Sequence, residues 1–183
     1  DRPTSQIVEK EINDYLETIG VNATFKLLVE DPEGSPTKAL EKTQSLVARG
    51  VKVILDWRSS AQVVAVKNYA DQHHILIVSG ASTSPSLAIP NDYIFRLIPD
   101  DRFQATAIKS VLISLGIEAV VVIQRGDAWG DGIYEPFEKA YTAAGGTILK
   151  RIRYDPTATE FSSEVSIAAS SIKNAIAEYG KDK

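Results

Sequence analysis

Short runs of valine, isoleucine and leucine recur along the chain, and helical patterns lie between most of them. The clearest runs occupy residues 51–55, 75–78 and 119–123. Such runs are typical of strands buried on both faces, as the strands of parallel sheets are. Because strands that alternate with helices form βαβ units, the pattern predicts an α/β chain with mostly parallel sheets.

Capping signals place the ends of several helices. Ser35 and Pro36 suit the N-cap and first position of a helix, and Gly20 and Gly50 suit helix ends. Residues 79–92 form a loop between two strands in this interpretation. We therefore expect helices at 6–20, 36–50, 59–74, 102–116, 132–146 and 161–180, and strands at 24–31, 51–57, 75–80, 92–99, 119–124 and 147–155.

The chain has a natural break near its middle. Its 183 residues suffice for one ordinary domain or two small ones. Residues 96–101 read Arg-Leu-Ile-Pro-Asp-Asp, so a proline and two acidic residues end a strand there. Strand and helix patterns begin again after this point. The sequence predicts two Rossmann-like lobes, residues 1–97 and residues 98–183.

Charge and composition exclude several classes of protein. The 20 basic residues are outnumbered by 24 acidic ones, for a net charge of -4, and no basic cluster stands out. A nucleic-acid partner is not expected, because phosphate-binding surfaces carry an excess of positive charge. The absence of cysteine rules out disulfides and thiolate chemistry. No apolar run approaches the ~20 residues that span a membrane.

The usual enzyme signatures are absent. The chain contains no GxGxxG, GxxxxGK[ST] or GxSxG motif. Its only histidines, His73 and His74, are adjacent and do not share a helix face. Neither a metal site nor a Ser/His/Asp triad is therefore expected. We predict a protein that is not an enzyme and that holds no cofactor.

Ligands of parallel α/β sheets bind at the carboxyl ends of the strands. Three such ends are informative here: 56–60, 79–83 and 125–132. In the first, Ser59 and Ser60 stand at a helix start, where free N–H groups favour an anion, although a plain N-cap is the alternative. Arg58 is either a partner for an anionic ligand or a surface charge. Trp57 is either a pocket wall or, by default, part of the core.

The other two strand ends offer polar and aromatic groups. Ala81 is small enough to let a ligand approach the backbone, and Ser82 and Thr83 add hydroxyl groups. A hydrophilic loop is the alternative for this stretch. Trp129 lies among glycines and is a candidate to cover a ligand, or else a packing residue that anchors its loop.

Six segments in register resemble the type I periplasmic solute-binding proteins, in particular the leucine/isoleucine/valine-binding receptors of ABC transporters. The matching segments are 11–20, 27–55, 59–85, 93–101, 126–149 and 155–165. The resemblance implies two α/β lobes with a ligand held between them. It places Ser59 and Ser60 at a site for the ligand's α-carboxylate, Ala81 and Thr83 at a site for its α-ammonium group, and Trp129 on the second lobe's wall.

The resemblance also implies a function and its surroundings. The expected function is capture of an amino acid or similar small carboxylate and its delivery to a membrane permease, in the periplasm or at the cell surface. The family's first strand and the rest of its second lobe are absent from these 183 residues, so the fold is expected to be incomplete. Apolar strand edges left bare can then associate with another copy or with a missing segment.

Two features keep the ligand and the function open. Trp57 and Arg58 stand where the family usually has Gly-Pro, which favours a ligand other than an aliphatic amino acid. A ligand-sensing domain of a regulator or receptor can share this fold, because function resides in the site and the flanking domains. An α/β enzyme of flavodoxin-like shape is a third alternative, but the sequence offers no combination of acid, base and nucleophile for it.

Overall fold

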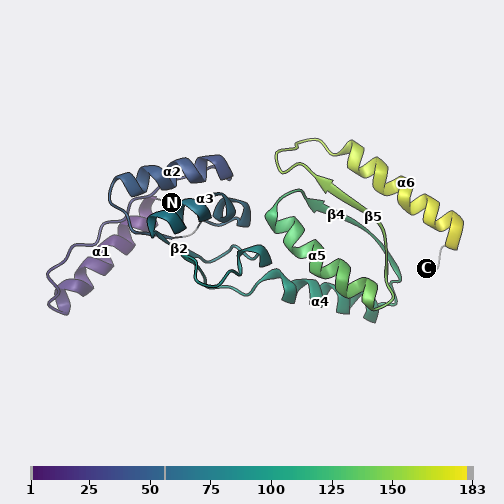
Figure 1. The fold of residues 1–183 in the computed structure, drawn as a ribbon, viewed down its shortest axis with the longest axis horizontal. Helices are drawn as coiled ribbons and strands as arrows, with labels where there is room; N and C mark the ends of the chain where they lie inside the picture. The colour runs from purple at the N-terminus through teal and green to yellow at the C-terminus, as the bar shows by residue number, and fades with distance from the viewer. Residues whose placement is uncertain (1, 56, 181–183) are drawn as a thin grey trace.

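The structure is a computed structural model that describes residues 2–55 and 57–180, and it contains two parallel sheets with helices packed on them (Figure 1). Its elements are α1 (Arg2–Thr18), α2 (Pro36–Ala48), β1 (Val53–Leu55), α3 (Ser60–His73), β2 (Leu76–Ser79), the 3₁₀ turn η1 (Pro85–Leu87), β3 (Ile94–Arg96), α4 (Asp101–Ser114), β4 (Ala119–Arg125), α5 (Ala128–Ala143), β5 (Thr147–Tyr154) and α6 (Ser162–Tyr179). The α/β class and the parallel sheets are confirmed.

The first sheet has the order β1-β2-β3, and both of its strand pairs are parallel. Its buried face carries Ile54, Ile77 and Ile94, one from each strand. These side chains join a core with residues of α2 and α3, among them Leu46 and Val66. Alternation along the strands explains the pattern, since successive side chains point to opposite faces.

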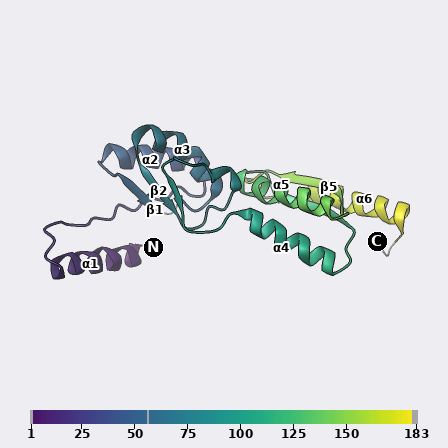
Figure 2. The same ribbon diagram turned by 60° about the horizontal axis from the view of Figure 1, so that its bottom comes forward.

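The other face of the first sheet is largely uncovered among the described residues. Val53, Leu55 and Phe95 are each at least half exposed. Helix α1 does not cover them, and it lies beside the body of the protein with its own Ile7 and Tyr15 exposed (Figure 2). Helix α1 therefore leaves several apolar side chains exposed among the described residues.

The expected strand at 24–31 is wrong, because this segment is extended but forms no ladder with any described strand. Side chains of α1 bind its backbone instead. Phe25 N–H donates to the Asn13 side chain, which donates back to the Phe25 carbonyl. Leu27 N–H donates to Glu9 at 2.8 Å. A strand-like sequence needs a neighbouring strand before it becomes part of a sheet.

The second sheet pairs β4 with β5 in parallel, with an irregularity in register next to Val120. Helices α4 and α5 share one core with the sheet, built around Ala105, Phe137 and Tyr141. The Tyr141 hydroxyl donates to the Ile117 carbonyl at 2.8 Å, which joins α5 to the turn before β4. Helix α6 runs along the side of the strands that faces away from α5 (Figure 1).

The two sheets have separate cores, and β3 leads directly into α4. The boundary between residues 97 and 98 is compatible with this arrangement and stays a prediction. The first turns of α5 contact α3 and η1, so elements of the two halves touch. Within the described residues, no helix is long and apolar enough to cross a bilayer.

Candidate ligand-binding site

The ends of β1 and β2 are tied together by buried hydroxyl groups. The Oγ atoms of Ser79 and Ser82 lie 2.9 and 3.0 Å from the Trp57 carbonyl oxygen. Both serines are fully buried. Ser82, one of the predicted site residues, therefore fixes the shape of the loop after β2 rather than presenting its hydroxyl at the surface.

The ring of Trp57 lies in the core of the first sheet, with only 4% of the residue exposed. Its Nε1–H donates to Thr43 Oγ1 at 3.0 Å, so the polar edge of the indole is satisfied inside the core. The structure therefore agrees with the interpretation of Trp57 as a core residue and not as a pocket wall. Arg58, next along the chain, is exposed.

Ser59 and Ser60 begin α3 as the cap pattern predicts. Ser59 Oγ accepts from Gln62 N–H, and the Gln62 side chain accepts from Ser59 N–H, which is a capping box. Ser60 is buried, and its Oγ accepts from Ser84 N–H at 3.1 Å. Each serine uses an oxygen lone pair in these contacts. The N–H groups of the first turn remain a favourable environment for an anion.

The loop after β2 is held from one side by Arg96 of β3. The Arg96 guanidinium donates to the carbonyls of Ser82 and Ser84 at 3.3 and 2.9 Å. Ala81 lies between the buried, hydrogen-bonded serines Ser79 and Ser82, and it is exposed. The loop therefore presents Ala81 on a backbone whose course is set by buried hydrogen bonds.

Asp101, which the sequence analysis did not select, binds the predicted site residue Thr83. Thr83 Oγ1 donates to Asp101 Oδ2 at 2.9 Å, and Asp101 N–H donates to the Thr83 carbonyl at 2.9 Å. Asp101 is 1% exposed. An ionised carboxylate only accepts hydrogen bonds, so the Thr83 hydroxyl donates to it and keeps its lone pairs for another donor. The paired aspartates after Pro99 were the available signal for this residue.

Burial raises the pKa of Asp101, and the neighbouring charge of Asp100 acts in the same direction. When an acidic group has a raised pKa in the folded state, the folded protein loses stability as the pH rises through that pKa. We therefore expect Asp101→Asn to gain stability relative to the wild type between acid and neutral pH. Urea unfolding of the full-length protein from pH 4 to pH 8 measures this difference.

Asp100 supplies a control, because its pKa is shifted in the opposite direction to that of Asp101. Its pKa is lowered, chiefly by the hydrogen bond from the Arg102 side chain. Its stabilising contribution is present above the ordinary aspartate pKa and is lost as the pH falls. Asp100→Asn should therefore lose stability relative to the wild type as the pH rises through the range below the ordinary aspartate pKa. It should then stay less stable by a constant amount over the interval in which Asp101→Asn gains stability. A parallel pH trend for the two variants contradicts this assignment.

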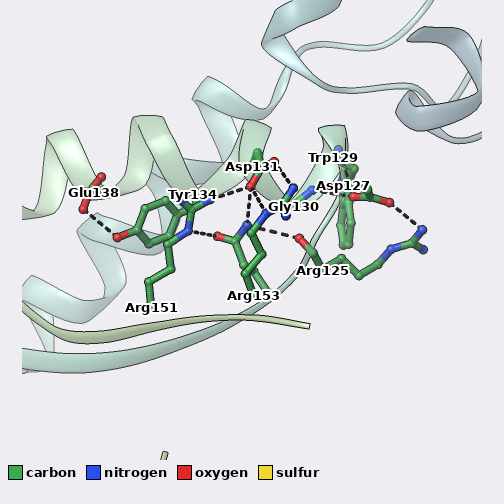
Figure 3. A network of polar contacts seen from close by, with 10 residues as sticks. Arg125, Asp127, Trp129, Gly130, Asp131, Tyr134, Glu138, Arg151 and Arg153 are labelled. Atoms are coloured by element: carbon green, nitrogen blue, oxygen red, sulfur yellow. Dashed lines mark hydrogen bonds and ion pairs between the residues drawn. The ribbon is translucent and has the colours of Figure 1, made fainter. Parts of the chain in front are cut away.

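Trp129 lies in the first turn of α5, which begins at Ala128 and not at 132 as expected. Asp127 explains the earlier start, because its side chain caps the helix by accepting from the N–H groups of Trp129 and Gly130. Asp127 also pairs with Arg125 at 2.6 Å (Figure 3). Trp129 is 38% exposed, so part of its ring faces solvent.

A polar network behind Trp129 fastens α5 to the second sheet (Figure 3). Asp131 accepts from Arg151 at 2.6 Å and from Arg153 at 2.8 and 2.9 Å. The Arg151 guanidinium also lies 3.9 Å from the centre of the Tyr134 ring. Burial, with help from the hydrogen bond to Glu138, raises the pKa of Tyr134 to about 12.

Loss of the Asp131 charge should loosen α5. The Arg153 hydrogen bond holds the pKa of Asp131 below its ordinary value, so its contribution to stability is lost as the pH falls through the acid range. We expect Asp131→Asn to lower the free energy of unfolding at pH 7 by roughly 1–2 kcal/mol, the size of one or two partly exposed charged hydrogen bonds. Urea unfolding at pH 7 checks this value, and an unchanged midpoint contradicts it.

Helix α5 lies close against the first half of the chain at Gly132. A Cβ atom at this position would lie 2.8 Å from Ser84 Oγ and 2.9 Å from Pro85 Cδ. Ser84 is also the residue that binds Ser60. The loop at 84–85 therefore joins the start of α3 to the first turns of α5. A cavity of about 480 Å³ lies between this loop and α5.

The structure thus brings most of the predicted site residues to one region. Ser59, Ser60, Ala81 and Thr83 lie on connected backbone at the ends of β1 and β2. Trp129 stands one turn from the contact between Gly132 and Ser84. Among the described residues, no group of three or more His, Asp or Glu side chains could hold a metal ion.

Curated relatives match most of the chain. An uncharacterized protein of Methanocaldococcus jannaschii is 36% identical over 183 residues, which is 97% of this chain and 43% of that protein. Glutamate receptor 2.4 of Arabidopsis thaliana is 30% identical over 139 residues, which is 75% of this chain and 15% of the receptor. The chain thus spans less than half the length of either relative.

Solved structures share the fold. A leucine-binding protein of Thermotoga maritima superposes with a TM-score of 0.75 at 24% identity, covering 82% of this chain and 44% of that one. A solute-binding protein of an ABC transporter from Rhodopseudomonas palustris was solved with 3,4-dihydroxybenzoic acid. It superposes with a TM-score of 0.70 at 20% identity, and the match covers 89% of this chain and 47% of that one. The family model described as periplasmic binding protein matches residues 8–177. The chain therefore belongs to the periplasmic binding proteins, and its fold is the type I, Leu/Ile/Val-binding-like form.

Proposed function

We propose that the full-length protein is the extracytoplasmic solute receptor of an ABC transporter. Its ligand is an amino acid or a similar small carboxylate, which it captures between two lobes and presents to the membrane permease. Of the residues predicted from the sequence, we assign ligand contacts to Arg58, Ser59, Ser60, Ala81, Thr83 and Trp129. Asp101 supports Thr83 from behind, and the buried residues Trp57 and Ser82 support the loops.

One observation carries this proposal. A helix start that favours an anion and a hydroxyl that favours a hydrogen-bond donor lie on the same connected loops. Ser59 and Ser60 begin α3, and Thr83 is backed by the buried carboxylate of Asp101. The pair is complementary to the carboxylate and the ammonium group of an α-amino acid.

The other residues take supporting roles in this proposal. Ala81 offers its exposed backbone to the ligand, and Arg58 adds positive charge at the rim. Trp57 and Ser82 hold the loops in place from inside the core. Trp129 covers the ligand from the side of α5. Closure of the two lobes around the ligand is a hinge motion of the kind that binding proteins use.

The comparisons support a small carboxylate as ligand. One structural neighbour is a leucine-binding protein and another was solved with 3,4-dihydroxybenzoic acid, and both compounds carry a carboxylate group. Only leucine carries an ammonium group as well. The carboxylate contact at α3 is thus the common element, and the Thr83 contact distinguishes an amino acid from an aromatic acid.

Calorimetry on the full-length protein tests the proposal. The titration panel holds the standard amino acids and hydroxylated benzoic acids. We expect at least one compound to bind with a Kd in the micromolar range or tighter, about -8 kcal/mol or better. If no compound of either class binds to correctly folded protein, the proposed function is wrong.

A ligand-sensing domain of a membrane receptor is the second candidate. It is favoured by the relative named glutamate receptor 2.4, which matches three quarters of this chain. The same ligand chemistry would serve such a domain, so the site does not separate the two functions. The complete reading frame does, since a receptor carries membrane helices in the same polypeptide and a transporter component is paired with a separate permease.

A further inference from the structure

The loop after β2 and the start of α4 meet in a hydrogen-bonded pair of side chains, Thr83 and Asp101. Asp101 is 1% exposed, whereas Thr83 is only partly buried. We propose that Asp101 is a positioning residue whose protonation decides which class of ligand the site takes: an α-amino acid when Asp101 is ionised, and the corresponding α-keto acid when it is neutral. This inference rests on the proposed function, because it concerns the same Thr83 contact.

An ionised Asp101 allows the hydrogen bond between the two side chains to run in only one direction. A carboxylate accepts and cannot donate, so the hydroxyl proton of Thr83 must lie toward Asp101 Oδ2, with 2.9 Å between the oxygens. Thr83 Oγ1 then has lone pairs but no proton for the ligand. An ammonium group fits such an oxygen, and the negative charge behind it strengthens the contact. A keto oxygen does not fit, because two acceptors would face each other.

A neutral Asp101 removes this constraint. Its carboxyl group can donate its own proton to Thr83 Oγ1, since a protonated carboxylic acid has one O–H donor. The Thr83 hydroxyl is then free to donate to a keto oxygen of the ligand. An ammonium group loses the negative charge behind Thr83 and competes with Asp101 for the lone pairs. Protonation therefore disfavours the amino acid and favours the keto acid at the same atom.

The backbone holds the two residues together in either state. Asp101 N–H donates to the Thr83 carbonyl at 2.9 Å. Arg96 donates to the carbonyls of Ser82 and Ser84, on both sides of Thr83, at 3.3 and 2.9 Å. None of these hydrogen bonds involves the Asp101 carboxyl group. We therefore expect protonation to change the direction of one hydrogen bond without releasing the loop.

The surroundings of Asp101 favour its neutral form more than water does. Burial is the largest cause that raises its pKa, and the charge of Asp100 acts in the same direction. The hydrogen bond from Thr83 and the positive charge of Arg96 oppose the rise, and Arg102 is paired with Asp100. An ammonium group bound at Thr83 would favour the ionised form. Binding of an amino acid should therefore release a proton from Asp101 when the pH is near its pKa.

Calorimetry on the full-length protein from pH 4 to pH 7 tests the inference, with the tightest-binding amino acid and its α-keto acid as ligands. We expect the ratio of the two affinities to change about 10-fold or more in favour of the amino acid as the pH rises, the size of one charged hydrogen bond. Titrations in buffers of different ionisation enthalpy should show release of up to about one proton per bound amino acid. A constant ratio overturns this inference alone, whereas absence of amino-acid binding at every pH overturns the proposed function with it.

Two asparagine variants locate the effect. Asp101→Asn cannot ionise, so its ratio of affinities should stay near the wild-type ratio at pH 4 over the whole range. Asp100→Asn keeps the ionisable group but removes a negative neighbour, so the midpoint of its pH profile should move to lower pH. A wild-type profile in Asp101→Asn contradicts the assignment to Asp101, and so does a midpoint in Asp100→Asn that is not lower than that of the wild type.

Discussion

Thr83→Ala in the full-length protein should weaken the binding of an α-amino acid about 10- to 100-fold. The proposed contact is a hydrogen bond from the ligand ammonium group to Thr83 Oγ1, whose own proton is directed to Asp101. A hydrogen bond to a charged group contributes about 1.5–3 kcal/mol, which corresponds to this range of Kd. Isothermal titration calorimetry measures the change.

Thr83→Ser is the matched control for this prediction. It keeps the hydroxyl group and should bind within about threefold of the wild type, since only a methyl group of partial exposure is lost. An aromatic carboxylate without an amino group should bind the wild type and Thr83→Ala equally well. If Thr83→Ala and Thr83→Ser weaken amino-acid binding alike, the hydroxyl is not the contact.

Gly132→Ala should weaken ligand binding about 10-fold or more while leaving the second sheet folded. A Cβ atom at this position would approach Ser84 Oγ and Pro85 Cδ to within 2.9 Å, so α5 must move away from the loop. Overpacking of this kind costs about 1–3 kcal/mol. Because the contact joins the two halves of the chain, we expect this free-energy cost to oppose closure of the two lobes around the ligand. Calorimetry gives the affinity, and small-angle scattering gives the change in compactness on binding.

Gly130→Ala is the contrasting variant in the same turn of α5. Its Cβ atom would lie 2.1 Å from the Arg125 carbonyl oxygen, within the second half of the chain. Backbone cannot yield as a side chain can, so this variant should lower Tm strongly with or without ligand. If Gly132→Ala behaves as Gly130→Ala does, the Gly132 contact supports the fold and not closure.

Local signals were enough to predict most of the helices and strands. Ser35 and Pro36, and Ser59 with Gln62, begin helices where the pattern of capping residues places them. The runs of branched apolar residues at β1, β2 and β4 form the parallel strands that they indicate. Each of these features depends on neighbours in the sequence, so the sequence alone contains the needed information.

Features that depend on distant neighbours were harder to predict. The strand expected at 24–31 lacks a partner strand, and no local pattern reveals that. The start of α5 at Ala128 follows from the cap at Asp127, a signal that was present but assigned to a loop. Arg96 and Asp101 act on the loop after β2 only because β3 and α4 return to it.

In the candidate site too, residues marked by their sequence neighbours could be predicted, and those that depend on distant contacts could not. Ser59, Ser60, Ala81 and Thr83 could be selected because each follows an expected strand. Asp101 could not, because its role depends on burial against Thr83 through a contact 18 residues away in the sequence. Trp57 shows the converse, since an aromatic residue beside the site has its ring in the core.

In the proposed site, two points on the protein hold the two charged groups of an α-amino acid. The most direct measurement compares three ligands by calorimetry on the full-length protein: the tightest-binding amino acid, its deaminated acid and its decarboxylated amine. We predict that loss of either group weakens binding at least about 10-fold, the cost of a lost charged hydrogen bond. Equal binding of the amine and the amino acid would contradict a carboxylate site at the start of α3.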